Sequence, residues 1–287
     1  MLIRYLGVRG STPAPGSDFV RYGGHTSCVA VSSVPAASTG ADGADSSTGY
    51  GPPRLVLDAG TGLRALGEHL DGQAFQGTIL VSHLHWDHVH GLPFFVQGDR
   101  PDASVDLYLP AQDGATGLSL LSRAMSPPSF PITPDQLGGR WDFHAIEPGT
   151  FTVEGVVVTA AEINHKGGRT FGYRLEDEHG SMAYLPDHAP AAGVTEGALE
   201  LAHDVDVLLH DSQFVEAERS LADLYGHATV DDAVAFAVSA GARSLVLFHH
   251  GPSRTDDRLE QILAATDAPI PVTLARQGDT LDIGVQP

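Results

Sequence analysis

The chain has 287 residues, and its hydrophobic content of 42% can fill one large core or two modest ones, so we expect a single domain over residues 1–287. The formal net charge is −20, with 36 acidic residues against 16 lysines and arginines, and this charge opposes the binding of long nucleic acids. Cys28 is the only cysteine, which excludes an intrachain disulfide and a thiolate metal cluster.

The first part of the chain predicts a strand-helix-strand unit preceded by two strands. Apolar, β-prone runs predict strands at 2–8, 26–31, 54–57 and 78–82. Residues 34–53 are rich in Gly, Ser, Ala and Pro and predict a flexible loop. An amphipathic pattern predicts a helix at 62–70, between the third and fourth strands.

Strand candidates continue along the rest of the chain, at 105–109, 156–163, 171–175, 181–185, 205–209 and 245–248. Many strands with fewer helices predict packed sheets flanked by helices, an α/β (α+β) architecture. The segment 123–140 contains four prolines and cannot form one regular element, so it is a candidate lid or a plain surface loop. No apolar run approaches the roughly 20 residues that cross a bilayer, and the first residues lack a signal-peptide layout. We therefore expect a cytoplasmic protein without membrane association.

Four side chains that can bind metals lie within six residues after the predicted strand 78–82: His83, His85, Asp87 and His88. On an extended chain His83 and His85 point to the same side, and the following turn can bring Asp87 and His88 to a second ion. Nitrogen and oxygen donors of this kind suit Zn²⁺, Mn²⁺ or Fe. The pattern predicts a metal site at the end of a buried strand.

This segment, SHLHWDHVHG, resembles the metallo-β-lactamase superfamily, whose fold is a four-layer αββα sandwich. In that superfamily the remaining ligands follow strand ends in the order His, bridging Asp, His. The chain has His165, Asp187 and His249 in that order, each just beyond a predicted strand. The resemblance implies one ion bound by His83, His85 and His165, a second bound by Asp87, His88 and His249, and Asp187 bridging both.

Further segments resemble the phosphodiesterase branch of the superfamily, typified by ribonuclease Z, over nearly the whole chain: LGVRGSTPAPG, GGHTSC, FGYRLE, HDSQF, GHAT and LFHHGPSR. The resemblance implies two divalent ions, Zn²⁺ first and Mn²⁺ or Fe as alternatives, and attack of metal-bound hydroxide on a phosphodiester. Asp87 would belong to the catalytic groups, and His227 would be the general acid, oriented by Asp211. We find no extended arm for gripping tRNA, so we expect a small-molecule substrate. Related phosphodiesterases are commonly dimers, and a homodimer is expected on that ground.

Four further residues have two interpretations each. Asp58 follows a predicted strand, where relatives use an acid to hold a metal-site histidine and where an acid also caps helices. His25 either makes capping hydrogen bonds or reaches the site. Arg9 either meets a substrate phosphate or pairs with an acid. His250 rivals His249 as the last ligand, and the motif alignment favours His249.

The pattern also departs from that of relatives, and other functions stay open. Pro186 stands where the superfamily commonly has Gly, and Trp86 between His85 and Asp87 either packs structurally or walls the pocket. A lactone or thioester hydrolase is an alternative, because the same nucleophile attacks carbonyls. An iron-binding oxidoreductase or a cofactor-pathway binding protein of the same fold is another, since the donor set permits iron.

Overall fold

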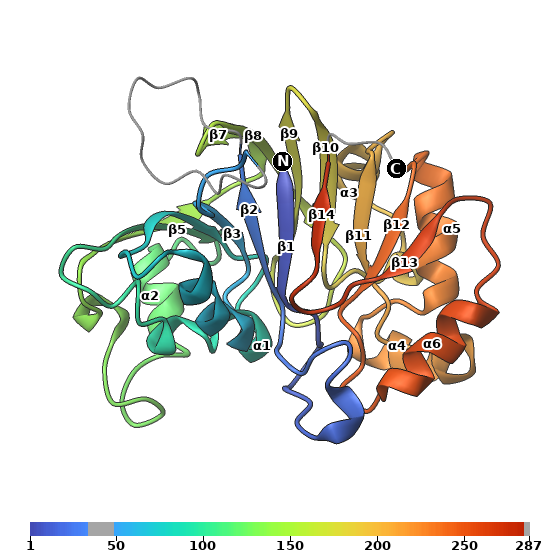
Figure 1. Ribbon diagram of the computed structural model, residues 1–287, viewed down its shortest axis with the longest axis horizontal. Helices are drawn as coiled ribbons and strands as arrows, with labels where there is room; N and C mark the ends of the chain where they lie inside the picture. The colour runs from blue at the N-terminus through green and yellow to red at the C-terminus, as the bar shows by residue number, and fades with distance from the viewer. Residues whose placement is uncertain (34–48, 284–287) are drawn as a thin grey trace.

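The structure is a computed structural model that describes residues 1–33 and 49–283, and it contains two seven-stranded mixed sheets (Figure 1). The strands of the first sheet are, in spatial order, β14 (Thr280–Asp282), β1 (Leu2–Gly7), β2 (Cys28–Ser32), β3 (Leu55–Leu57), β4 (Gln76–Leu80), β5 (Ser104–Pro110) and β6 (Arg140–Ile146). Those of the second sheet are β13 (Val272–Leu274), β12 (Leu245–Phe248), β11 (Val207–Asp211), β10 (Gly180–Leu185), β9 (Thr170–Asp177), β8 (Val156–Ile163) and β7 (Gly149–Val153).

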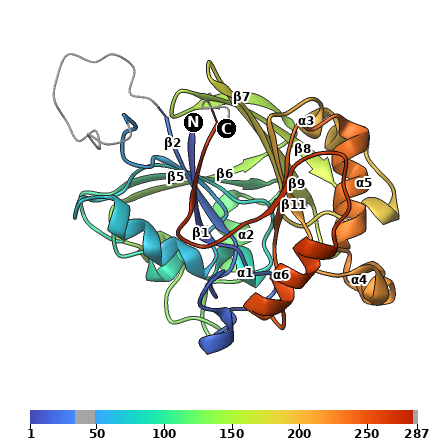
Figure 2. The same cartoon turned by 45° about the vertical axis from the view of Figure 1, so that its right-hand side comes forward.

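Helices cover the outer face of each sheet (Figure 2). Those on the first sheet are the 3-10 helix η2 (Thr61–His69), α1 (Trp86–Val89) and α2 (Gly117–Ser122). Those on the second sheet are α3 (Glu196–Ala202), α5 (Val230–Ala240) and α6 (Asp256–Ala265). The remaining helices are α4 (Arg219–Tyr225) and the 3-10 turns η1 (Ser17–Phe19), η3 (Leu92–Phe94), η4 (Pro134–Gln136), η5 (Pro190–Ala192) and η6 (Glu216–Glu218).

Buried apolar side chains form three clusters, one at each contact between neighbouring sheets or between a sheet and its helices. One cluster lies between the sheets and includes Tyr173 and Phe248. A second lies between the first sheet and its helices, with Leu63 against Ile79, and the third contains Phe236 of α5 beneath the second sheet. Burial of these surfaces is the main force that holds helix on sheet and sheet on sheet. The arrangement confirms the predicted four-layer αββα sandwich.

The predicted strands are present, with shifted ends, but several elements differ from the sequence expectation. The helix predicted at 62–70 is a 3-10 helix, and its glycines Gly62 and Gly67 disfavour α-helical backbone. The strand predicted at 205–209 runs instead from Val207 to Asp211, so Asp211 ends the strand. Strands β6, β7, β13 and β14 were not predicted: β13 and β14 have only three residues each, and β6 is half-buried without a clear alternation.

Two irregular segments were singled out from the sequence. Residues 34–48 of the predicted flexible loop lie outside the described residues, whereas the buried Tyr50 donates a hydrogen bond to Asp282 at 2.7 Å. The segment 123–140 is irregular as predicted, apart from η4 and the first residue of β6. Its Phe130 ring packs edge-on against Phe94, with 6.0 Å between ring centroids. Within residues 1–33 and 49–283 we find no helix that is long and apolar enough to cross a membrane.

The topology gathers strand ends at one end of the sandwich, where α1 and α4 lie (Figure 1). Strands β3, β4, β5 and β6 are parallel neighbours, and so are β10, β11, β12 and β13. The carboxyl ends of parallel strands share one edge of a sheet, which is where α/β proteins commonly place ligands. The loops that follow β4, β8, β10 and β12 meet there and carry the predicted metal ligands.

Candidate metal centre

The first group of candidate ligands combines residues from three separate loops. His83 and His85 follow β4, His165 follows β8, and Asp187 follows β10. Their ligand atoms all lie within 4.8 Å of one another. Asp187 Oδ2 lies 3.4 Å from both His83 Nε2 and His165 Nε2, and His165 Nε2 lies 3.2 Å from His85 Nδ1. Ligands about 2.1 Å from one tetrahedral ion would stand about 3.4 Å apart, so this spacing suits a single ion.

The second group shares Asp187 and adds Asp87, His88 and His249. Asp187 Oδ1 lies 3.2 Å from His88 Nε2 and 3.0 Å from His249 Nε2. Asp87 Oδ2 lies 3.3 Å from the same His88 nitrogen and 3.2 Å from the same His249 nitrogen. One oxygen of Asp187 therefore faces each group, which is the arrangement that a bridging carboxylate requires.

The chemistry of these atoms fits bound cations. His83 Nε2, His88 Nε2 and Asp187 Oδ1 are buried and have no hydrogen-bond partner among the described residues. Leaving such atoms unpaired costs about 1–3 kcal/mol each, unless a cation takes the partner's place. Burial lowers the pKa of His83 well below its usual value, which leaves a neutral ring with a free lone pair. Burial opposes charge on His88 too, but the surrounding carboxylates prevail and raise its pKa, so this site attracts positive charge.

A second set of contacts orients the ligand histidines. Asp58 is fully buried and its Oδ2 lies 2.7 Å from His88 Nδ1, while Ser82 N–H and the Tyr184 hydroxyl donate to the same carboxylate at 2.7 and 2.9 Å. With one proton held on Nδ1, Nε2 is the nitrogen that His88 can offer to a cation of the second group, in place of its other proton. His165 Nδ1 likewise donates to the Gly226 carbonyl at 2.6 Å, which directs its Nε2 to the first group. Of the two roles considered for Asp58, the structure shows the support of a histidine.

His227 and Asp211 form a buried pair beside both groups. His227 Nδ1 lies 2.8 Å from Asp211 Oδ2, and the His227 ring centroid is 4.9 Å from that of His165 and 5.2 Å from that of His249. Asp211 Oδ1 also accepts a hydrogen bond from the backbone N–H of Gln213 at 2.9 Å. Burial disfavours the imidazolium, but the charge and hydrogen bond of Asp211 prevail and raise the pKa of His227 to about 9. A protonated, oriented imidazole at neutral pH can act as a general acid.

The structure separates His249 from its rival His250. His249 joins the second group, whereas His250 Nε2 donates to the carbonyl of Ala275 at 2.8 Å and lies outside both groups. Strand β12 ends at Phe248, and the turn at His249 sends the two adjacent imidazoles to different partners. His249 also adopts a positive φ of 57°, which is uncommon for a residue other than glycine and is found most often where function demands it.

Arg9 and His25 lie near the centre without joining it. The fully buried Arg9 guanidinium donates to the carbonyls of Gly23 and Arg254, each at 2.7 Å, and lies 3.6 Å from Asp256. Of the two interpretations of Arg9, the structure shows the pairing with an acid and buries the guanidinium that a substrate phosphate would have to reach. His25 is half-buried and its Nδ1 lies 3.2 Å from the Thr61 hydroxyl, which corresponds to the hydrogen-bonding one of its two interpretations.

Sequence reasoning missed two residues that shape the centre. The backbone N–H of Ser11 donates to Asp87 Oδ2 at 2.7 Å, and Ser11 has a φ of 61°, which no local pattern announces. Gly167 has a φ of 98°, and a Cβ at this position would lie 2.8 Å from His85 Nε2. The Gly167-Gly168 pair, separated from His165 by Lys166 alone, was a visible signal that the backbone there must approach another group closely.

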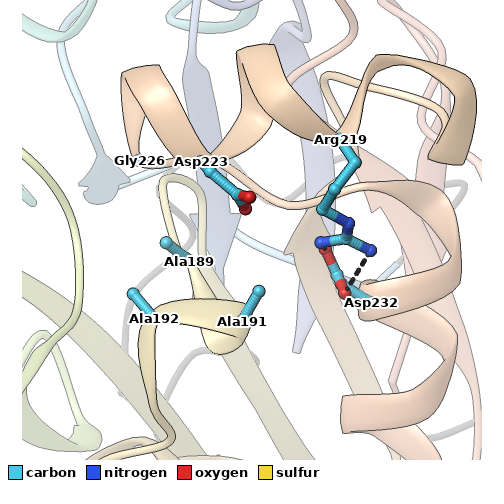
Figure 3. A pocket seen from close by; sticks show the side chains of 7 residues that line it. All are labelled: Ala189, Ala191, Ala192, Arg219, Asp223, Gly226 and Asp232. Atoms are coloured by element: carbon cyan, nitrogen blue, oxygen red, sulfur yellow. Dashed lines mark hydrogen bonds and ion pairs between the residues drawn. The ribbon is translucent and has the colours of Figure 1, made fainter.

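A pocket of about 430 Å³ adjoins this region, lined by Ala189, Ala191, Ala192, Arg219, Asp223, Gly226 and Asp232 (Figure 3). One of its lining residues, Gly226, accepts the hydrogen bond of His165, whereas no residue of the two donor groups lines it. Arg219 is neutralised by ion pairs with Asp232 and Glu216. Asp223, whose side chain points into the space in Figure 3, has no hydrogen bond or ion pair with any described residue.

Sequence comparison finds a matching family model and curated relatives. A family model described as a beta-lactamase superfamily domain matches residues 53–250. The chain is 30% identical over 223 residues to ribonuclease Z of Limosilactobacillus fermentum, covering 60% of this chain and 68% of the relative.

Solved structures show the same fold at low identity. The metallo-beta-lactamase fold protein YhfI of Bacillus subtilis has a TM-score of 0.68 and 16% identity, with 98% of each chain covered. A diphosphatase from the PhnP family has a TM-score of 0.67 and 18% identity, covering 98% of this chain and 97% of that protein. These structures show the fold. The family-model match over residues 53–250 spans more than half of the chain, and the protein therefore belongs to the beta-lactamase superfamily.

Proposed function

We propose that this protein is a metal-dependent phosphodiesterase that binds two divalent ions and hydrolyses a small phosphodiester, with His227 as general acid. The observation that carries the proposal is the shared Asp187 carboxylate, whose two oxygens face two separate groups of nitrogen and oxygen donors. The protonated His227–Asp211 pair beside these groups supplies the acid that hydrolysis of an ester with a poor leaving group needs.

The proposed ligands are His83, His85, His165 and Asp187 for one ion and Asp87, His88, His249 and Asp187 for the other. Zinc is the first choice of metal, with manganese or iron as alternatives, because all donors are nitrogen or oxygen. Two bound ions would supply Lewis acidity toward the phosphoryl group and a strong nucleophile at neutral pH.

The chain's own residues have separate tasks in this proposal. Asp58 holds the proton on His88 Nδ1, and the Ser11 N–H orients the carboxylate of Asp87. His227 donates a proton to the departing oxygen, and Asp211 keeps the imidazole protonated and aimed until that step. General acids positioned in this way contribute about 10² to 10⁴ in rate.

Three observations support a small phosphodiester as the substrate. The names of two similar proteins, a ribonuclease and a diphosphatase, both denote cleavage at phosphorus. The net charge of −20 opposes long polyanions. The pocket of about 430 Å³ is in the range that holds small ligands, about 300–1,000 Å³, and its unpaired Asp223 would repel additional phosphates.

The test combines metal analysis with a substrate panel. Asp187→Asn should lose most of about two metals per chain, whereas Asp256→Asn, which alters an equally buried carboxylate that pairs with Arg9, should keep them. The metal-loaded wild type should hydrolyse bis(p-nitrophenyl) phosphate faster than p-nitrophenyl phosphate or a lactone. Metal-free protein that resists reconstitution would refute the metal assignment. Preferential turnover of lactones or thioesters would refute the phosphodiester assignment while retaining the metal centre.

A further inference from the structure

Two buried histidines, His188 and His210, have no role in the chemistry proposed above. His188 directly follows Asp187, and His210 directly precedes Asp211, so each is attached to one of the central carboxylates. Both side chains are fully buried. Their rings pack against Phe236 of α5, with centroid distances of 4.8 Å for His188 and 5.2 Å for His210.

The hydrogen bonds of this pair have only one consistent direction. His210 Nδ1 lies 2.8 Å from the backbone carbonyl of Asp211, and a carbonyl only accepts, so His210 carries its proton on Nδ1. Burial lowers the pKa of both imidazoles, and a neutral ring has a single N–H. His210 Nε2 therefore accepts the bond from His188 Nδ1–H, at 2.8 Å. The backbone N–H of His188 completes a ring of bonds by donating to Asp211 Oδ2 at 3.3 Å.

This ring of hydrogen bonds lies just beyond the last backbone pairing between β10 and β11. The last paired positions of β10 and β11 are Leu185 and His210. The next residue, Pro186, has no N–H to extend the pairing. Asp187 and the Asp211 carboxylate thus lie beyond the paired residues of β10 and β11. The hydrogen bonds of His188 to Asp211 and His210 join the segment after β10 to the end of β11.

The pair also retains an unfavourable feature. With the proton on Nδ1, His188 Nε2 holds a lone pair that is buried and has no partner among residues 1–33 and 49–283. An apolar residue of similar size in place of His188 would avoid this unpaired acceptor. An unpaired buried acceptor of this kind needs an explanation, and a role in positioning the site supplies one.

We propose that His188 and His210 are positioning residues: their mutual hydrogen bond fixes the Asp211 carboxylate relative to the Asp187 segment and so holds His227 in line with the leaving oxygen. The inference rests on the proposed general-acid role of His227. It adds that proton donation depends on a hydrogen-bonded histidine pair that lies outside both donor groups.

The experiment compares leaving groups across variants of His188. His188→Leu should reduce kcat about 10-fold or more for a diester with a poor, alkyl leaving group, since general acids contribute about 10² to 10⁴. Hydrolysis of bis(p-nitrophenyl) phosphate should fall less than about threefold, because p-nitrophenolate needs little protonation. KM and metal content should not change. His188→Asn should restore most of the lost rate, because its amide nitrogen can donate where Nδ1–H does.

Two further variants keep the test decisive. Phe236→Leu loosens the packing on both rings without removing a hydrogen bond, so it should lower the melting temperature but leave the ratio between leaving groups unchanged. His210→Asn keeps a donor for the Asp211 carbonyl and removes the acceptor for His188, so it should show the effect expected of His188→Leu. It serves as the test if His188→Leu does not fold.

The outcomes separate this inference from the proposed function. Equal losses for good and poor leaving groups in His188→Leu and His210→Asn, or the same ratio change in Phe236→Leu, would overturn the positioning role. Loss of metal from His188→Leu would overturn it as well, because the pair would then support Asp187 rather than Asp211. If His227→Gln lowers kcat by the same factor for good and poor leaving groups while the wild type hydrolyses diesters, His227 is not the general acid. The inference then falls with the proposed function.

Discussion

Replacement of Asp58 by asparagine tests how far one buried carboxylate supports the metal centre. Asp58 accepts hydrogen bonds from His88, from the Ser82 backbone and from the Tyr184 hydroxyl. Asparagine keeps the shape but exchanges one oxygen for an NH₂ group, which cannot accept. At least one of these buried donors then loses its acceptor, and the proton on His88 Nδ1 is no longer held.

The expected size of the effect follows from the role of Asp58 behind His88. Removing a carboxylate that supports a ligand histidine typically costs about 10- to 100-fold in metal affinity. That range corresponds to about 1.4–2.7 kcal/mol of binding free energy for the ion at His88. The unpaired buried donor should also lower the free energy of unfolding of the metal-free protein by about 1–3 kcal/mol.

Metal affinity would be measured by competition with a chromogenic chelator, and stability by urea denaturation of the metal-free protein. Asp256→Asn is the matched control: Asp256 is buried, accepts the Arg21 amide at 2.7 Å and pairs with Arg9, but lies outside both donor groups. The control should lose stability and keep metal affinity. If Asp58→Asn binds both ions with an affinity within threefold of wild type, or if Asp256→Asn loses affinity equally, then Asp58 does not support metal binding through His88.

Three further predictions address single contacts of the centre. Gly167→Ala should weaken metal binding at least about tenfold by displacing the His85 ring, whereas Gly155→Ala, which has a φ of 78° and open space around its Cβ, should cost only about 1 kcal/mol of stability; equal metal affinity in the two variants would contradict this. His249→Ala should halve the metal content and His250→Ala should leave it unchanged, as elemental analysis would show; the reverse result would reassign the last ligand. His227 is protonated below its raised pKa and loses the proton above it, so turnover of alkyl diesters should fall as the pH rises toward about 9. Bound cations would oppose this rise in pKa and move the fall to lower pH. A pH–rate profile of His227→Gln should lack this alkaline limb; an unchanged limb would exclude His227 as the titrating acid.

The predictable part of the candidate site is the part that the chain encodes locally. His83, His85, Asp87 and His88 lie within one turn after a buried strand, and their spacing alone brings them to one end of β4. Packed sheets flanked by helices were also predictable, because apolar strands and amphipathic helices must each bury one face. The four-layer order followed from the resemblance to the metallo-β-lactamase superfamily.

Edge strands and backbone strain were not predictable, for a common physical reason. Strands β13 and β14, with three residues each, gain their structure from hydrogen bonds to neighbours rather than from their own composition. The positive φ values of Ser11 and His249 cost energy locally and persist only because the surrounding structure enforces them. Local propensity therefore says little about either feature.

The sequence by itself determined which residue types can form the centre and the order in which they follow the strands. Only the tertiary structure decided which of them meet: it buried Arg9 against Asp256, turned His250 to Ala275, and placed one oxygen of Asp187 toward each donor group. Strand ends and ligand spacing depend on neighbours along the chain. The approach of side chains from β4, β8, β10 and β12 depends on how two sheets pack, which is a property of the whole core.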